Sequence, residues 1–130
     1  MDAAAALADL TEISSQVETA AVFGSDGSTL ASTFADDEAA ARLVGAAREL
    51  LAAAAEVPTG TGRELTQLEV GLQEGSVFVV RDGELAIAAT TAARPTAGLV
   101  LYDLRTCLRA LAPAKPAAKK RRAPRKTADA

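Results

Sequence analysis

The spacing of apolar residues along the chain changes between a helical period of three to four and a strand period of two. Apolar positions three or four apart predict helices over residues 2–16, 36–55 and 96–111. Short apolar runs bounded by turn residues predict strands over residues 19–24, 29–34, 65–73, 76–81 and 84–91. The expected order is therefore helix, two strands, helix, three strands, helix.

Acidic-glycine pairs mark the turns between these strands. Asp26-Gly27 and Asp82-Gly83 are typical of tight hairpins, because glycine tolerates positive φ and aspartate bonds to the local backbone. Glu74-Gly75 predicts a third turn. The continuous apolar run 77–80 suits a strand covered on both faces, whereas 65–73 alternates as a half-buried strand does. Together they predict an α/β three-layer sandwich around one five-stranded antiparallel sheet.

Each predicted helix begins at a residue that can cap it. Asp2 suits the first helix, the acidic run 36–38 suits the second, and Thr96 suits the third. The inner face of the first helix would carry Leu7, Leu10, Ile13 and Val17. The inner face of the last would carry Val100, Leu104, Cys107, Leu108 and Leu111.

The second predicted helix is apolar over more than one face. One stripe consists of Leu43, Ala47, Leu50 and Ala54, and an adjacent one of Val44, Leu51 and Ala55. Two interpretations are open: the second stripe packs against a second copy of the chain, or it lies beneath the first helix. In addition, the edge of strand 65–73 could pair with another chain.

Charge divides the 130-residue chain into an acidic domain, residues 1–112, and a basic tail, residues 113–130. The domain holds seven arginines, no lysine and sixteen acidic residues, a net charge of −9. The tail's cations are Lys115, Lys119, Lys120, Arg121, Arg122, Arg125 and Lys126. Because the tail has no large apolar residue, we expect it to be disordered. It could bind DNA or an anionic membrane surface, but it could also serve only solubility or fold back on the acidic domain.

Few residues in the chain suit catalysis. It has no histidine, and Cys107 falls on an apolar stripe, as a small buried hydrophobe would. The acidic run 36–38 could hold a cation but is explained by helix capping. Gly60-Thr61-Gly62 leads into Arg63-Glu64 and a strand, unlike a Walker loop. We therefore expect a binding protein with no enzymatic activity, cofactor, metal or small-molecule substrate.

Cysteine content and hydropathy bear on the compartment. A single cysteine excludes an intrachain disulfide. The N-terminal residues lack the positive and continuous apolar regions of a signal peptide, and no apolar run approaches the roughly 20 residues of a membrane span. The expected location is the cytoplasm.

The element order, the Phe23–Gly27 hairpin and the Gly75–Thr91 meander resemble the Roadblock family, over roughly residues 5–111. This family has a profilin-like fold, and the resemblance implies a homodimer in which the second helices pack together and the third strands pair. The implied interface residues are Leu43, Val44, Ala47, Leu51, Leu68, Glu69, Val70 and Gly71.

The resemblance also implies a partner. Family members, including bacterial ones, bind small Ras-like GTPases and regulate them, or act as adaptors. We therefore expect a dimeric regulator or adaptor of such a GTPase. The alternative is an architectural or scaffold protein in which the domain only dimerises and the basic tail binds DNA or an anionic surface.

Overall fold

The computed structural model describes residues 2–57 and 67–111. Its elements follow the predicted order and are α1 (Ala3–Ile13), β1 (Val17–Gly24), β2 (Thr29–Ser32), α2 (Asp37–Ala55), β3 (Gln67–Gly71), β4 (Gly75–Asp82), β5 (Leu85–Ala92) and α3 (Ala97–Leu111). The five strands form one antiparallel sheet in the order β2-β1-β5-β4-β3. The predicted fold class is confirmed.

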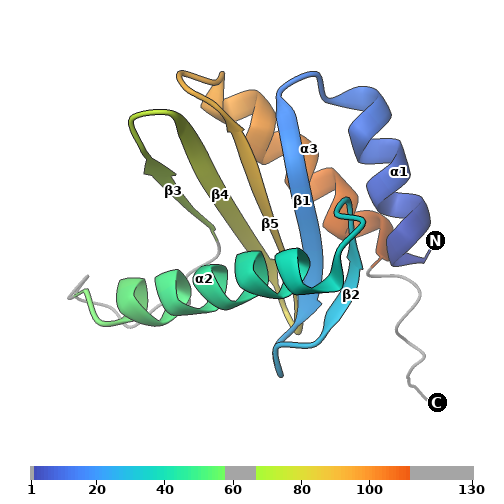
Figure 1. Cartoon of the computed structure of the whole chain (residues 1–130), viewed down its shortest axis with the longest axis horizontal. Coiled ribbons are helices and arrows are strands. Elements are labelled where there is room, and N and C mark those ends of the chain that lie inside the picture. Colours follow the sequence, from blue (N-terminus) through green and yellow to red (C-terminus); the bar gives the residue numbers. More distant parts are fainter. Residues whose placement is uncertain (1, 58–66, 112–130) are drawn as a thin grey trace, which may run out of the picture.

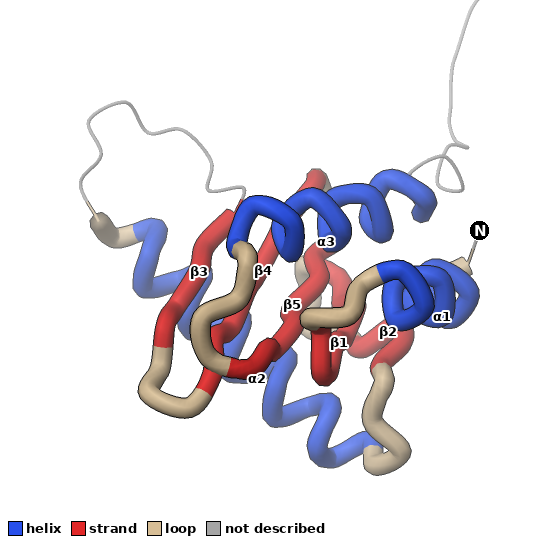
Figure 2. Tube along the Cα trace, turned by 90° about the horizontal axis from the view of Figure 1, so that it is seen from above, coloured by secondary structure: helices blue, strands red, loops and turns tan. Residues whose placement is uncertain are grey.

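Helices cover both faces of the sheet (Figure 1). The helix α2 crosses one face, and α1 and α3 lie side by side on the other, as the view from above also shows (Figure 2). Since β1 pairs with β5 at the centre, β2 and β3 form the two edges. The domain therefore has three layers.

The turns have the predicted chemistry. Gly27 and Gly83 adopt φ values of +90° and +65°, which favour glycine. In the first turn the Asp26 carboxylate accepts hydrogen bonds from the backbone N–H and the hydroxyl of Ser28. Those bonds lower the pKa of Asp26, because they favour its charged form.

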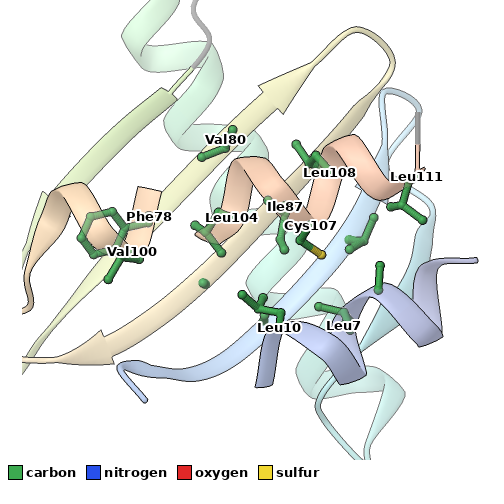
Figure 3. Close-up of a cluster of buried hydrophobic side chains, with 14 residues drawn as sticks. Leu7, Leu10, Phe78, Val80, Ile87, Val100, Leu104, Cys107, Leu108 and Leu111 are labelled. Carbon is green, nitrogen blue, oxygen red and sulfur yellow. The ribbon is translucent and has the colours of Figure 1, made fainter. Parts of the chain in front are cut away.

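Two apolar cores lie on opposite faces of the sheet. The larger one packs α1 and α3 against Phe78, Val80 and Ile87 (Figure 3). The smaller one packs α2 against Phe23 and Val79. Neighbouring residues of β4 thus point into different cores, which confirms that this strand is covered on both faces.

The first helix ends earlier than predicted. It stops at Ile13, whose side chain is 67% exposed, and Val17 begins β1 instead of continuing the helix. Ser14 is the reason: its backbone is extended, and its hydroxyl accepts from the N–H groups of Gln16 and Val17. A serine hydroxyl can thus replace the helical bonds of the following residues.

The other boundaries shift by a few residues. β2 ends at Ser32 rather than Phe34, because the Ala20 N–H donates to the Thr33 hydroxyl and not to a backbone carbonyl of β2. β3 ends at Gly71, and Leu72 is exposed in the following turn. Residues 65 and 66 lie outside the described part of the chain. The caps Asp2 and Asp36 are confirmed, since their carboxylates accept from Ala5 and Glu38.

Candidate functional site

The inner face of α2 is committed to the domain's own sheet. Val44 and Ala47 are 3% and 0% exposed and belong to the smaller core, and Ala40 of the same helix is also buried. These side chains are therefore already covered within one copy of the chain. Residues Arg42, Gly45, Ala46, Arg48, Glu49, Ala52 and Ala53 are exposed on the outer side of the helix.

Between these two sides lies a row of half-buried apolar residues, Leu43, Leu50, Leu51 and Ala54. The helix α1 cannot cover them, because it lies on the opposite face of the sheet (Figure 1). The interpretation that the second stripe of α2 lies beneath the first helix is therefore wrong. Within the described residues the row stays partly open to solvent.

The half-buried surface continues from α2 onto the sheet. Leu68 of β3 and Val77 of β4 are partly buried against the smaller core, as are Leu43 and Leu51. Val70 pairs with Val77, so both side chains lie on the α2 side of the sheet. We call the residues Leu43, Leu50, Leu51, Leu68, Val70 and Val77 the α2–β3 surface.

The α2–β3 surface borders a free strand edge. β3 pairs with β4 on one side and with no other described strand on its second side. The Leu72 N–H donates to the Gly75 carbonyl over 2.7 Å, which makes these two residues a hydrogen-bonded pair. Because such pairs alternate along an antiparallel ladder, the backbone groups of Gln67, Glu69 and Gly71 point to the free edge.

The predicted interface residues thus fall into three groups. Leu43, Leu51, Leu68 and Val70 lie on the half-buried surface, Glu69 and Gly71 lie on the free edge, and Val44 and Ala47 lie in the core beneath them. The structure brings all eight to one side of the domain. Their contact with a second copy stays a prediction.

A small pocket lies beside this surface, where the C-terminal half of α2 crosses the ends of β1, β4 and β5. It measures about 250 Å³, and Arg48, Leu51, Arg81 and Glu84 are among its lining residues. The Arg48 guanidinium also lies over Gly27, where an added Cβ would approach it to 2.5 Å. The pocket combines an apolar wall with two cations, and at its rim the Ser25 hydroxyl donates to the Glu84 carboxylate over 2.6 Å.

Cys107 is unsuited to nucleophilic chemistry. It lies 5% exposed in the larger core, as the apolar stripe predicted. Burial first, and then the nearby negative charge of Asp9, raise the pKa of its thiol to about 11. The thiol is therefore neutral at physiological pH, and a neutral thiol is a poor nucleophile.

Other candidate chemistry gives little more. Within residues 2–57 and 67–111 no three acidic, cysteine or histidine side chains are grouped so as to hold a metal ion. None of the helices in this part of the chain is long and apolar enough to cross a bilayer. The loop 60–62 and the tail cations Lys115, Lys119, Lys120, Arg121, Arg122, Arg125 and Lys126 lie outside the described residues. The prediction that the tail is disordered also concerns residues outside the described part of the chain.

One feature escaped the sequence analysis. A groove between α1 and α3 carries the carboxylates of Asp9 and Asp103. A signal for it was present, because Asp103 follows Val100 by three residues and precedes Cys107 by four, which puts it on the inner side of the helix.

A family model for the Roadblock/LC7 domain matches residues 4–92. The chain belongs to the Roadblock/LC7 family. The predicted family is thereby confirmed, and the match spans all five strands together with α1 and α2. No curated protein matches the sequence at a significant level.

Solved structures share the Roadblock/LC7 fold with this chain. A Roadblock/LC7 domain from Streptomyces avermitilis is 17% identical, with a TM-score of 0.79 over 88% of this chain and 98% of that one. MglB from Myxococcus xanthus is 12% identical, with a TM-score of 0.65 over 86% and 83%. The gliding protein MglB from Thermus thermophilus is 18% identical, with a TM-score of 0.65 over 89% and 90%. At these identities the likeness concerns the fold.

Proposed function

We propose that this Roadblock/LC7 protein is a cytoplasmic, homodimeric regulator or adaptor that binds a small Ras-like GTPase and acts without chemistry of its own. The observation that carries the proposal is the α2–β3 surface next to a free strand edge, in a chain of this family. The family resemblance supplies the GTPase as the class of partner.

The dimer would form by pairing of β3 with β3 of a second copy. Edge pairing satisfies the outward backbone groups of Gln67, Glu69 and Gly71, and it brings two α2–β3 surfaces together. Burial of Leu51 and Leu68 would then favour association, because each square ångström of apolar surface removed from water contributes about 25 cal/mol. Support from related folds includes a structure of MglB with a tetrameric arrangement.

A dimer could act on a GTPase through contacts alone. Small GTPases change activity when their switch loops are ordered or displaced, which requires a complementary surface rather than a catalytic side chain. An exposed outer side of α2, doubled by the dimer, would offer such a surface. The pocket with Arg48 and Arg81 lies at its border.

The dimer is tested by a backbone substitution with a matched control. Glu69→Pro removes one outward N–H while leaving the bonds from β3 to β4 in place. Glu69→Gln keeps that N–H and removes the charge. We expect a monomer for the first variant and a dimer for the second, by light scattering during gel filtration. A dimeric Glu69→Pro protein would contradict pairing at this edge.

The GTPase is tested with purified proteins. The full chain would be immobilised and presented with the Ras-like GTPases of the source organism, each loaded with GDP or with a non-hydrolysable GTP analogue. We expect retention that depends on the nucleotide. Hydrolysis rates with and without the protein then separate activation from sequestration. Equal retention of both nucleotide states would indicate a scaffold, and no retention would exclude these GTPases as partners.

A second function is favoured by the tail's charge. Its seven cations could tether the dimer to DNA or anionic lipid, with a steep dependence on salt. A full-length variant with Gln at all seven positions is the control for both functions. GTPase binding should survive this change, whereas binding to DNA or anionic vesicles should disappear.

A further inference from the structure

A groove of about 270 Å³ runs between α1 and α3, on the side of the domain opposite to α2. Its floor is apolar and includes Leu10 and Cys107, which come from facing helices (Figure 3). At one end Ile13 and Tyr102 are 67% and 58% exposed. The groove is therefore an open apolar surface, separate from the α2–β3 surface and from the free edge of β3.

The groove also contains a buried carboxylate. Asp103 is only 8% exposed, and no described residue donates a hydrogen bond to it. Asp9 lines the groove from the facing helix, and its charge contributes to the raised pKa of Cys107. A carboxylate with so little exposed surface is stabilised when a cation or a hydrogen-bond donor meets it.

The described domain supplies no such cation. The helix α1 has no basic residue. On α3, Arg105 and Arg109 belong to a different pocket against β4, where the Arg105 guanidinium donates to the Gln67 side chain. The groove thus carries negative charge and apolar area, and it fits a segment rich in lysine or arginine. Such side chains lay their methylene groups on apolar surface while the charged end meets a carboxylate.

The chain's own tail has this chemistry and begins at the end of the groove. In Figure 3 the two helices run in opposite directions, with Leu7 of α1 toward Leu111 at the end of α3. Asp103 lies eight residues before Leu111, about 12 Å back along a helix. Lys115 is four residues after Leu111, and four extended residues span about 13 Å. Lys119 and Lys120 have a longer reach.

We propose that the α1–α3 groove is the docking site of the chain's own basic segment, with cations of residues 115–122 on Asp9 and Asp103. Every lysine of the protein lies in the tail, and the domain it leaves carries a net charge of −9. Docking gives the buried carboxylate its partner and covers the apolar floor. Because the same cations serve any outside polyanion, docking and polyanion binding are mutually exclusive.

Carbodiimide cross-linking tests this contact directly, since it joins a lysine amine to a carboxylate in contact with it. All four lysines lie at 115–126, so each cross-link within the chain reports where the tail is. An equal mixture of ¹⁴N and ¹⁵N full-length protein shows whether the two ends belong to one copy. We expect cross-links from Lys115, Lys119 or Lys120 to Asp9 and Asp103, within single copies, with a yield that falls as salt rises.

Single isosteric variants separate specific docking from general attraction. In Asp103→Asn, cross-links to Asp9 should fall about fivefold, the effect of losing one partner in a charged contact. The matched control, Asp37→Asn on the opposite face of the sheet, should leave them unchanged. Thermal unfolding establishes that both variants are folded.

Three results would overturn the proposal. Cross-links spread evenly over carboxylates of both faces would indicate unspecific attraction. Links between ¹⁴N and ¹⁵N copies would make a second molecule the occupant of the groove. An absence of cross-links to α1 or α3 would show that the tail does not occupy the groove. A further expected result is tighter binding of the Asp103→Asn variant to anionic vesicles, since its tail would be less occupied.

Discussion

Gly75 lies against the backbone carbonyl of Thr91, so closely that a Cβ at position 75 would approach the Thr91 oxygen to 2.5 Å. The contact joins the start of β4 to the end of β5. Neither partner can move easily, because both groups belong to the backbone of adjacent strands. A methyl group there forces the two strands apart.

Gly75→Ala should therefore destabilise the domain by about 1–3 kcal/mol, the usual cost of overpacking a fixed site. The matched control is Gly71→Ala in β3, where an added Cβ meets nothing within 4 Å. That change should leave the free energy of unfolding within about 0.5 kcal/mol of its original value. Urea unfolding of both variants measures the difference, and equal stabilities would contradict the close approach.

Removing the cap of α2 has a predictable cost. Asp36→Ala deletes the carboxylate that accepts from the Glu38 N–H over 3.0 Å and should lower stability by about 1 kcal/mol. Asp37→Ala, one residue further on, removes only a favourable charge near the helix start and should cost a few tenths, about 0.3 kcal/mol. Chemical denaturation gives both values. A larger loss for the second variant would show that capping is not the main contribution.

The larger core depends on Leu104, which is completely buried between α3 and the sheet. Leu104→Ala should cost about 2–5 kcal/mol, because it removes buried surface and leaves a cavity. Leu99→Ala on the same helix is the control, since that side chain is half exposed and its loss should cost less than about 0.5 kcal/mol. Similar losses of stability for both variants would contradict the assignment of Leu104 to the buried face of α3.

Stability should depend on alkaline pH through Cys107. The pKa of its thiol is about 11 in the folded domain, against 9.0 for an unperturbed cysteine thiol. The unfolded chain therefore loses this proton first, so the contribution is complete below pH 9 and disappears as pH rises to about 11. Cys107→Ala should show a shallower fall of unfolding free energy over this window. Identical slopes for the two proteins would mean that the thiol titrates normally.

Much of this architecture could be predicted from local sequence. The Asp-Gly turns, the carboxylate caps and the apolar stripe of α3 each depend on residues a few positions apart, and each is confirmed. The length of α1 could not be predicted by periodicity, because a serine hydroxyl ends the helix although apolar spacing continues to Val17. The missed boundary is thus a competition between a side chain and the helix for the same N–H groups.

The surfaces were harder to predict than the elements. Apolar spacing identified a broad face on α2 but could not separate Val44 and Ala47, which the sheet covers, from Leu51, which it covers in part. That distinction depends on the angle at which the helix crosses the strands. The groove that holds Asp103 depends on how α1 and α3 pack together, although most of the chain separates these two helices in sequence. A local sequence pattern carries no information about that packing.

The central position of the β1–β5 pair has a consequence for the newly made chain. The hydroxyls of Thr19 and Thr90 lie 2.6 Å apart although the residues are 71 positions apart in sequence. A ribosome therefore releases the β1–β2 hairpin and α2 well before it synthesises β5. Until then, the edge of β1 that will pair with β5 has no partner strand. Closing so long a loop makes sheet completion slow compared with hairpin formation. For that interval the nascent chain carries an open strand edge that chaperones, or a neighbouring nascent chain, can reach.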